Sequence, residues 1–267
     1  MEQIIIIGDF KIFVKIEGEG PPILLLHSYW GSQFLFDRLT GQLSVDHKVI
    51  RIDLPGHGKS GPPPEGYRFD LFAKVLNEIL EIIQVKERIA IIGHSMGGYA
   101  GLAFSARYPE KTASLVLMHS PVQNSDDQSI RQRNREAKLL ISGKKDLLLQ
   151  VTIPSNFAPG NDGNMVEEII LLNKAASEVT LPGALRSIEA MNKRNNYLGN
   201  LKEAGYPVLI IIGKHDKVYG FESQLADSVL IPSAEVLLLD HSGHLGFMEE
   251  YDLVLSALMR FLRRQIS

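Results

Sequence analysis

Short runs of apolar residues alternate along this chain with longer stretches in which apolar residues recur at helical spacing. Turn residues bound the runs, which is typical of buried strands, whereas the stretches between them are typical of amphipathic helices. We therefore predict strands in the first half of the chain at 4–7, 10–16, 23–27, 48–53, 88–92 and 113–118, and helices at about 32–43, 69–83 and 96–108. Such alternation predicts a parallel sheet with helices on both faces, which is an α/β fold.

The alternation stops after Ser120 and returns only near residue 207. The residues between are polar and helix-prone, and prolines and glycines interrupt them, so we predict several short helices there. Strands are predicted again at 207–213 and 235–239, followed by an amphipathic helix at 248–264. The middle segment is therefore interpreted as an insertion between two parts of one sheet.

Composition and charge exclude several classes of protein. The chain has 267 residues, of which 45% are hydrophobic, and this is enough for a substantial core. A net charge of −3 gives no reason to expect a nucleic-acid partner, and we interpret the short cluster Arg131, Arg133 and Arg135 as a solvent-exposed helix face. The sequence has no cysteine, which excludes disulfides, a cysteine nucleophile and thiolate metal sites.

The amino-terminal residues 1–7 lack the basic segment and the small-residue cleavage site of a secretory signal, and Asp9 and Lys11 follow them closely. We expect no secretory signal, no membrane span and a cytoplasmic location. No two histidines stand at the helical i, i+4 spacing of zinc hydrolases, and no glycine-rich loop opens a helix in a dinucleotide pattern. We therefore expect neither a metal nor a cofactor, while the oligomeric state is not indicated.

The segment Gly93-His94-Ser95-Met96-Gly97 carries the strongest chemical signal in the chain. It follows a predicted strand, precedes a predicted helix and has the pattern G-x-S-x-G of a nucleophile elbow. Glycine is needed on both sides of the serine because the turn is sharp and crowded. The serine hydroxyl is lifted clear of the sheet, and the Met96 N–H points to where an anionic oxygen would develop. Ser95 is thus the predicted nucleophile.

A serine hydroxyl needs a base, and the base needs an orienting acid. Active residues of open α/β sheets gather at the carboxyl ends of strands. His244 satisfies this rule after the predicted strand 235–239, with His241 as the alternative base. Asp216 satisfies it after the strand 207–213, with Asp240 as the alternative acid.

The loop after the third strand is predicted to complete the oxyanion hole. Tyr29 is the expected second backbone donor beside Met96, and the side chain of Trp30 is a candidate for the substrate pocket. His57 lies in a glycine-rich turn and is interpreted as structural. His94 lies inside the elbow, so it is expected to pack there or to contact substrate.

These motifs together resemble the α/β-hydrolase superfamily, in its branch of serine esterases with a helical cap. The resemblance rests on the elbow, the Asp216 and His244 loops, and the turn 53–60, and it extends over nearly the whole chain. It implies a mostly parallel eight-stranded sheet flanked by helices and a cap inserted after the sixth strand. Residues 1–120 and 203–267 would form the core, and residues 121–202 the cap.

The chain departs from the family at one position, because it has His27-Ser28 where the family usually has His-Gly. The resemblance implies a serine hydrolase that cleaves a small carboxylic ester, thioester or lactone, with a small acyl compound as its partner. The same triad also serves carbon–carbon hydrolases, lyases and perhydrolases, and a ligand-binding protein is the non-enzymatic alternative. Arg194 is the candidate for binding a substrate carboxylate.

Overall fold

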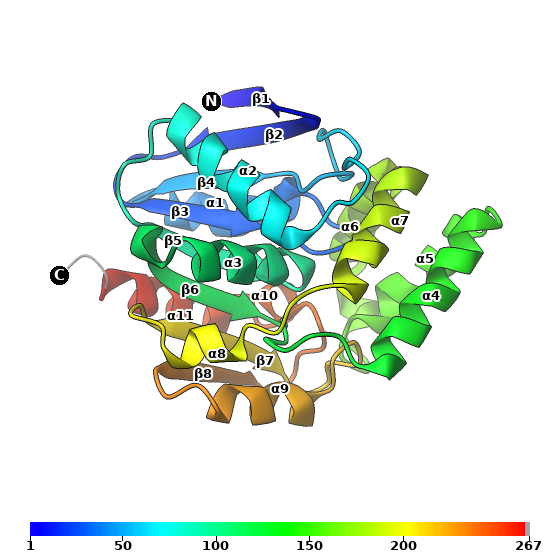
Figure 1. Ribbon diagram of the computed structural model, residues 1–267. Helices are drawn as coiled ribbons and strands as arrows, with labels where there is room; N and C mark the ends of the chain where they lie inside the picture. Colours follow the sequence, from blue (N-terminus) through cyan, green and yellow to red (C-terminus); the bar gives the residue numbers. More distant parts are fainter. Residues whose placement is uncertain (265–267) are drawn as a thin grey trace.

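The computed structural model describes residues 1–264, with Asp162 described by its backbone alone, and its centre is one eight-stranded sheet (Figure 1). The strand order is β1-β2-β4-β3-β5-β6-β7-β8; β2 pairs antiparallel with β1 and β4, and the remaining pairs are parallel. The strands are β1 (Glu2–Ile7), β2 (Phe10–Glu17), β3 (Pro22–Leu26), β4 (Lys48–Ile52), β5 (Ile89–His94), β6 (Thr112–Met118), β7 (Val208–Gly213) and β8 (Ala234–Leu239). The predicted parallel α/β sheet is confirmed.

Helices cover both faces of this sheet. In the view of Figure 1, α2, α3 and α9 lie in front of the strands, and α1, α10 and α11 lie behind them. Their bounds are α1 (Asp37–Leu43), α2 (Phe69–Ile82), α3 (Met96–Arg107), α9 (Phe221–Val229), α10 (Gly246–Glu249) and α11 (Tyr251–Arg263). The sequence prediction missed α9, and the closing helix predicted from residue 248 begins instead at Tyr251, after the short α10.

The segment between β6 and β7 is helical in the described residues. It contains α4 (Asp127–Ile141), α5 (Lys145–Ser155), α6 (Val166–Glu178), α7 (Leu181–Asn192) and α8 (Leu198–Lys202). The first four of these helices stand together beyond one end of the strands (Figure 1). Several short helices were predicted here; the division into core 1–120 and 203–267 and cap 121–202 stays a prediction, and residues 265–267 of that core lie outside the described residues.

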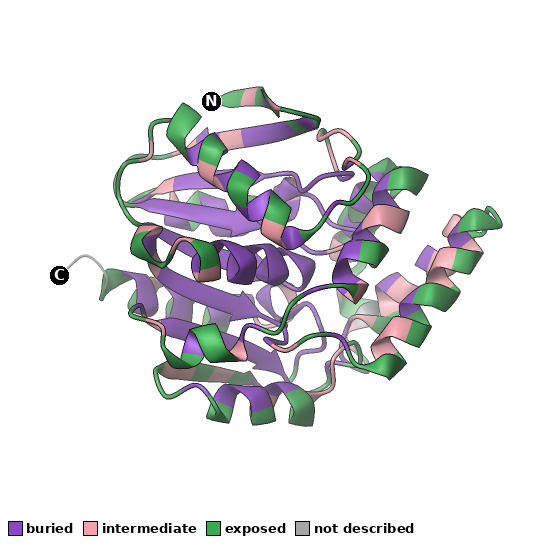
Figure 2. Ribbon diagram, viewed as in Figure 1, coloured by how far each residue is buried: buried purple, intermediate pink, exposed green. Residues whose placement is uncertain are grey.

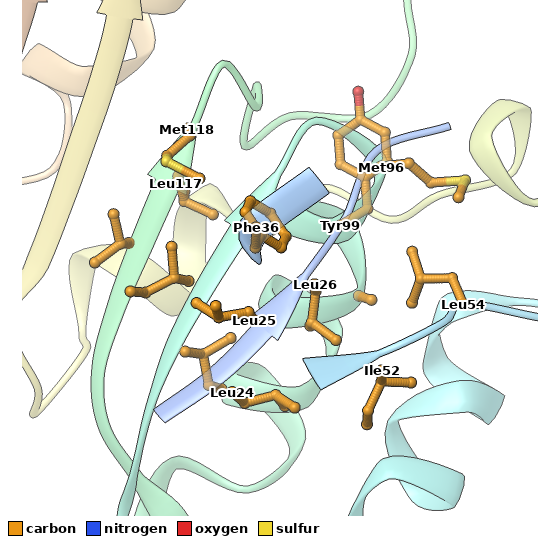
Figure 3. Close-up of a cluster of buried hydrophobic side chains, with 14 of the residues drawn as sticks. Leu24, Leu25, Leu26, Phe36, Ile52, Leu54, Met96, Tyr99, Leu117 and Met118 are labelled. Atoms are coloured by element: carbon orange, nitrogen blue, oxygen red, sulfur yellow. The ribbon is translucent and has the colours of Figure 1, made fainter. Parts of the chain in front are cut away.

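The hydrophobic core lies on both faces of the central strands, which Figure 2 shows as almost entirely buried. Leu26 ends β3 between Ile52 of β4 and Gly93 of β5, so the carboxyl ends of these strands meet at one edge. Leu26, Leu54 and Met96 belong to the cluster of buried side chains in Figure 3. The loops that follow the strands are therefore held on a packed foundation. Within residues 1–264, no helix is both long and apolar enough to cross a bilayer.

Candidate active site

Ser95 occupies the turn between β5 and α3, as the sequence predicts. Its φ of 52° lies in the left-handed region, which a side chain rarely adopts without support from its surroundings. Both flanking glycines are required by close approach: a Cβ on Gly93 would lie 2.6 Å from the carbonyl oxygen of Gly97, and one on Gly97 would lie 2.0 Å from that of Leu26. The Ser95 amide donates to the Met118 carbonyl at 2.9 Å, which fastens the turn to β6.

His244 and Asp216 meet at the same edge of the sheet. The Nδ1 of His244 lies 2.9 Å from Oδ2 of Asp216, and both side chains are buried. Asp216 Oδ1 accepts the amides of Val218 and Tyr219 at 2.8 and 3.3 Å, and Oδ2 also accepts Nε2 of Gln224 at 3.1 Å. Burial alone would raise the pKa of Asp216, but the charges of His244 and His119 and the hydrogen bonds from their rings hold that pKa well below its usual 3.8.

The geometry fixes the tautomer of His244. An ionised carboxylate only accepts hydrogen bonds, so Nδ1 of His244 carries the proton that Asp216 accepts. The Nε2 atom is then the acceptor position of the neutral ring. The backbone amide of His244 donates to the Asn156 carbonyl at 2.6 Å, which ties its loop to the end of α5. This histidine is thus oriented from two sides.

A second histidine on Asp216, His119, was not found from the sequence. It is fully buried at the end of β6, its φ is 51°, and its Nδ1 lies 3.3 Å from Oδ2 of Asp216. The amide of Gly246 donates to Nε2 of His119 at 3.2 Å, so Nδ1 holds the proton and donates to the carboxylate. Its position directly after a predicted strand is the one signal in the sequence that could have revealed it.

We expect His119→Ala to lower the free energy of unfolding by about 1.5–3 kcal/mol, because it removes a buried donor from a charged acceptor. His119→Asn should retain most of that stability, since asparagine tolerates the left-handed backbone and can present an N–H at the place of Nδ1. Urea unfolding of the two variants checks this. Equal losses in both would mean that the hydrogen bond to Asp216 contributes nothing.

The loop after β3 lies against the turn that carries Ser95. The contact between Gly97 and Leu26 brings the start of α3 to the end of β3, directly before the loop that holds Tyr29 and Trp30. The Met96 amide is the first of α3 and has no acceptor within the helix. His27 holds the loop in place: its Nδ1 donates to the Ser28 carbonyl at 2.8 Å, and its Nε2 accepts the amide of Leu54 at 2.8 Å.

A cavity of about 280 Å³ lies between the Ser95 turn, the His244 loop and the loop after β3. Ser95 and His244 line it together with Ser28, Tyr29 and Trp30, and the opposite wall comes from α4, α5, α6 and α7. The volume suits a small molecule rather than a polymer. The structure therefore brings the predicted nucleophile, base and oxyanion loop to one cavity beneath the inserted helices.

Other predicted residues lie elsewhere. His94 is buried, and its Nε2 donates to the carbonyl of His244 at 2.7 Å, so within the described residues it supports the loop that carries His244 and does not line the cavity. Arg194 is also absent from the cavity wall and bonds to the carbonyl of Gln123 at 3.0 Å. The alternatives His241 and Asp240 are exposed. The buried His57 donates to the Pro55 carbonyl at 3.1 Å.

One group of side chains has the composition of a metal site. The ligand atoms of His119, Asp216 and His244 lie within 4.8 Å of one another. Hydrogen bonds among these three residues, and from Gly246 to His119, already satisfy those atoms. The group is therefore complete as a hydrogen-bonded network of one carboxylate and two imidazoles.

A family model described as "alpha/beta hydrolase fold" matches residues 21–160. The chain belongs to the α/β-hydrolase family. The family match covers the strands and loops that carry Tyr29 and Ser95, and it confirms the predicted family, fold and enzyme class.

Individual α/β-hydrolases resemble the chain over different lengths. A 2-hydroxy-6-oxononadienedioate/2-hydroxy-6-oxononatrienedioate hydrolase of Paraburkholderia phymatum is 29% identical over 258 residues, which are 94% of this chain and 87% of that protein. A "serine hydrolase-like protein" of Danio rerio is 41% identical over 113 residues, but these are only 42% of this chain and 34% of the relative. A thermophilic esterase from Thermogutta terrifontis has the same fold, with a TM-score of 0.92 at 22% identity and full coverage of both chains.

Proposed function

We propose that this α/β-hydrolase is a serine hydrolase that cleaves a small carboxylic ester, thioester or lactone. One observation carries the proposal: Ser95 and His244 line the same cavity, and His244 is hydrogen-bonded at 2.9 Å to a buried carboxylate. A serine, a histidine and an orienting acid in this order along the chain are the parts of acyl-transfer catalysis. The thermophilic esterase with the same fold supports the ester class.

In the proposed mechanism, Ser95 attacks the substrate carbonyl while Nε2 of His244 takes the hydroxyl proton. Asp216 stabilises the imidazolium that forms, which its low pKa allows because it stays ionised. The amides of Met96 and Tyr29 bind the oxyanion of the tetrahedral intermediate. His244 then gives its proton to the leaving alcohol or thiol, and a water molecule releases the acyl group by the same steps, which regenerates Ser95.

Hydrolysis of a carbon–carbon bond is the second candidate activity. It is favoured by the likeness to the dienedioate hydrolase of Paraburkholderia phymatum, which extends over 94% of this chain. The proposed triad and oxyanion donors would act on a carbonyl in that reaction as well. Residues 121–202 are proposed to form a cap over the cavity, and the cytoplasmic location stays a prediction.

Labelling with a fluorophosphonate, read by intact mass, tests the proposed nucleophile. We expect a single adduct on the wild type and none on Ser95→Ala, because the probe reacts with a serine that a base activates. His244→Ala is expected to label far more slowly. A folded wild type that takes up no adduct at any concentration would favour a ligand-binding protein of the same fold.

A further inference from the structure

One polar stripe of α4 faces the cavity. Ser129, Gln132, Arg133 and Glu136 line it, and their spacing of three and four residues places them on one side of the helix. From the sequence, the arginine cluster 131–135 is expected to form a solvent-exposed face. This is wrong for Arg133, because the inserted helices and the loop after β6 enclose it.

Arg133 is held rigidly by neutral groups. Arg133 is only 8% exposed. Its Nε donates to Oδ1 of Asn192 at 2.8 Å, and its NH2 donates to Oγ of Ser125 at 2.5 Å. The remaining nitrogen, NH1, donates to no residue that the structure describes. These bonds fix the plane of the guanidinium but leave its charge without a counterion.

Arg194 adds a second buried charge behind the first. It is also 8% exposed, donates to the same Ser125 hydroxyl, and stacks on the ring of Tyr99 at 4.4 Å. Among the described side chains, no carboxylate lies within 4 Å of Arg133 or Arg194. Asp126 caps α4 at the surface through the amide of Ser129 and forms an ion pair with neither.

Glu136 is the acidic side chain in the cavity wall, and it forms an ion pair with neither arginine within 4 Å. Its Oε1 accepts Nε1 of Trp30 at 3.2 Å, on the side of the oxyanion loop. Burial raises the pKa of Glu136, despite the nearby charge of Arg133. Lys217 lines the cavity as well and adds positive charge.

An enclosed guanidinium without a counterion is costly, because burial removes water that would otherwise solvate the charge. A fixed guanidinium with a free N–H in a ligand cavity is well suited to a carboxylate, whose two oxygens match its fork. We propose that the substrate carries a carboxylate group that binds Arg133, so that the enzyme acts on acidic esters. Only the cleavage of the ester rests on the proposed function. Binding of a carboxylate to Arg133 does not depend on any catalysed reaction.

Paired substrates test this proposal. The monoethyl esters of succinic, glutaric and adipic acids carry a carboxylate where ethyl butyrate, pentanoate and hexanoate carry a methyl group. We expect the wild type to prefer at least one acidic ester over its neutral partner. Arg133→Gln should raise KM for that ester about 10- to 100-fold, the value of one hydrogen bond between charged groups, and leave the neutral ester unchanged.

Matched controls come from the same helix. Arg131 and Arg135 are exposed on α4, so Arg131→Gln and Arg135→Gln remove the same charge outside the cavity and should leave KM for both ester classes unchanged. Equal losses on acidic and neutral esters in Arg133→Gln would show a merely structural arginine and overturn the proposal. Arg133→Lys keeps the charge and is expected to recover a part of the acidic preference.

Calorimetric titration with adipate separates this proposal from the proposed catalysis. Ser95→Ala, which cannot form an acyl-enzyme, should bind the dianion, and the double variant Ser95→Ala/Arg133→Gln should bind it at least tenfold more weakly. If no ester is cleaved by the wild type, this titration still decides the anion site. Equal affinities in the two variants would overturn it whether or not the enzyme cleaves esters.

Discussion

Replacing Ser95 by alanine is expected to lower kcat/KM for an ester substrate by about 10⁴-fold or more. Ser95 is the proposed nucleophile, and without it only binding and oxyanion stabilisation by the protein would remain. Fold and stability should be preserved, because a hydroxyl is removed from the wall of a cavity and the hydrogen bond from the amide of residue 95 to the Met118 carbonyl remains. Steady-state rates with a chromogenic ester measure the loss, and circular dichroism checks the fold.

The size of the effect in the histidine variant is part of the same prediction. His244→Ala should be nearly as slow as Ser95→Ala, and the double variant no slower than either, because residues of a triad act as a unit. Losses that multiply would mean that the two residues act independently. His241→Ala is the matched control: this histidine lies in the same loop but is exposed, and its loss should leave the rate unchanged.

The parts of the site that the sequence predicts share a local cause. The turn at Ser95 is specified by residues next to it, since Gly93 and Gly97 are the positions where any side chain would collide with backbone. Asp216 and His244 follow strands, and parallel strands bring their carboxyl ends to one edge whatever the loops between them contain. Short-range pattern and sheet geometry together are therefore enough to predict these three residues.

The residues that the sequence did not reveal depend on distant partners. His119 contacts Asp216 across 97 residues, and Arg133 is buried by Asn192, which lies 59 residues further along. Arginine in a polar helix is usually solvated, so nothing local distinguishes Arg133 from its neighbours Arg131 and Arg135. α9 was missed because its buried positions are polar, Gln224, Asp227 and Ser228, so burial leaves no apolar pattern in the sequence.

Lowering the pH from 7 to 5 is expected to destabilise the folded protein by several kcal/mol. Burial lowers the pKa of His27 to about 4 and that of His57 to about 3, and it holds the pKa of His94 well below 6.5. Below pH 6.5 the unfolded chain therefore binds protons that the folded chain does not. The folded state has the full contribution of these neutral histidines to its stability above pH 6.5, and it loses that contribution as the pH falls toward their pKa values in the folded state. The loss is about 2 kcal/mol at pH 5 for each of His27 and His57, and His94 adds to it in the same direction.

Acidic groups act against this loss and do not abolish it. Burial raises the pKa of Asp53 and of Glu136, so these two bind protons more readily in the folded state and offset a part of the effect. Asp216 has a lowered pKa, and its contribution to stability is lost only as the pH falls below 3.8, outside this range. The histidines therefore determine the sign between pH 7 and pH 5.

Urea unfolding at both pH values, compared among three proteins, assigns the effect to buried histidines. His57→Asn keeps a donor for the Pro55 carbonyl but cannot titrate, so its loss of stability between pH 7 and pH 5 should be about 2 kcal/mol smaller than in the wild type. His241→Gln removes an exposed histidine and should lose as much as the wild type. A free energy of unfolding that stays the same at pH 7 and pH 5 would mean that these imidazoles take up protons without unfolding, and that the buried sites near the nucleophile admit water.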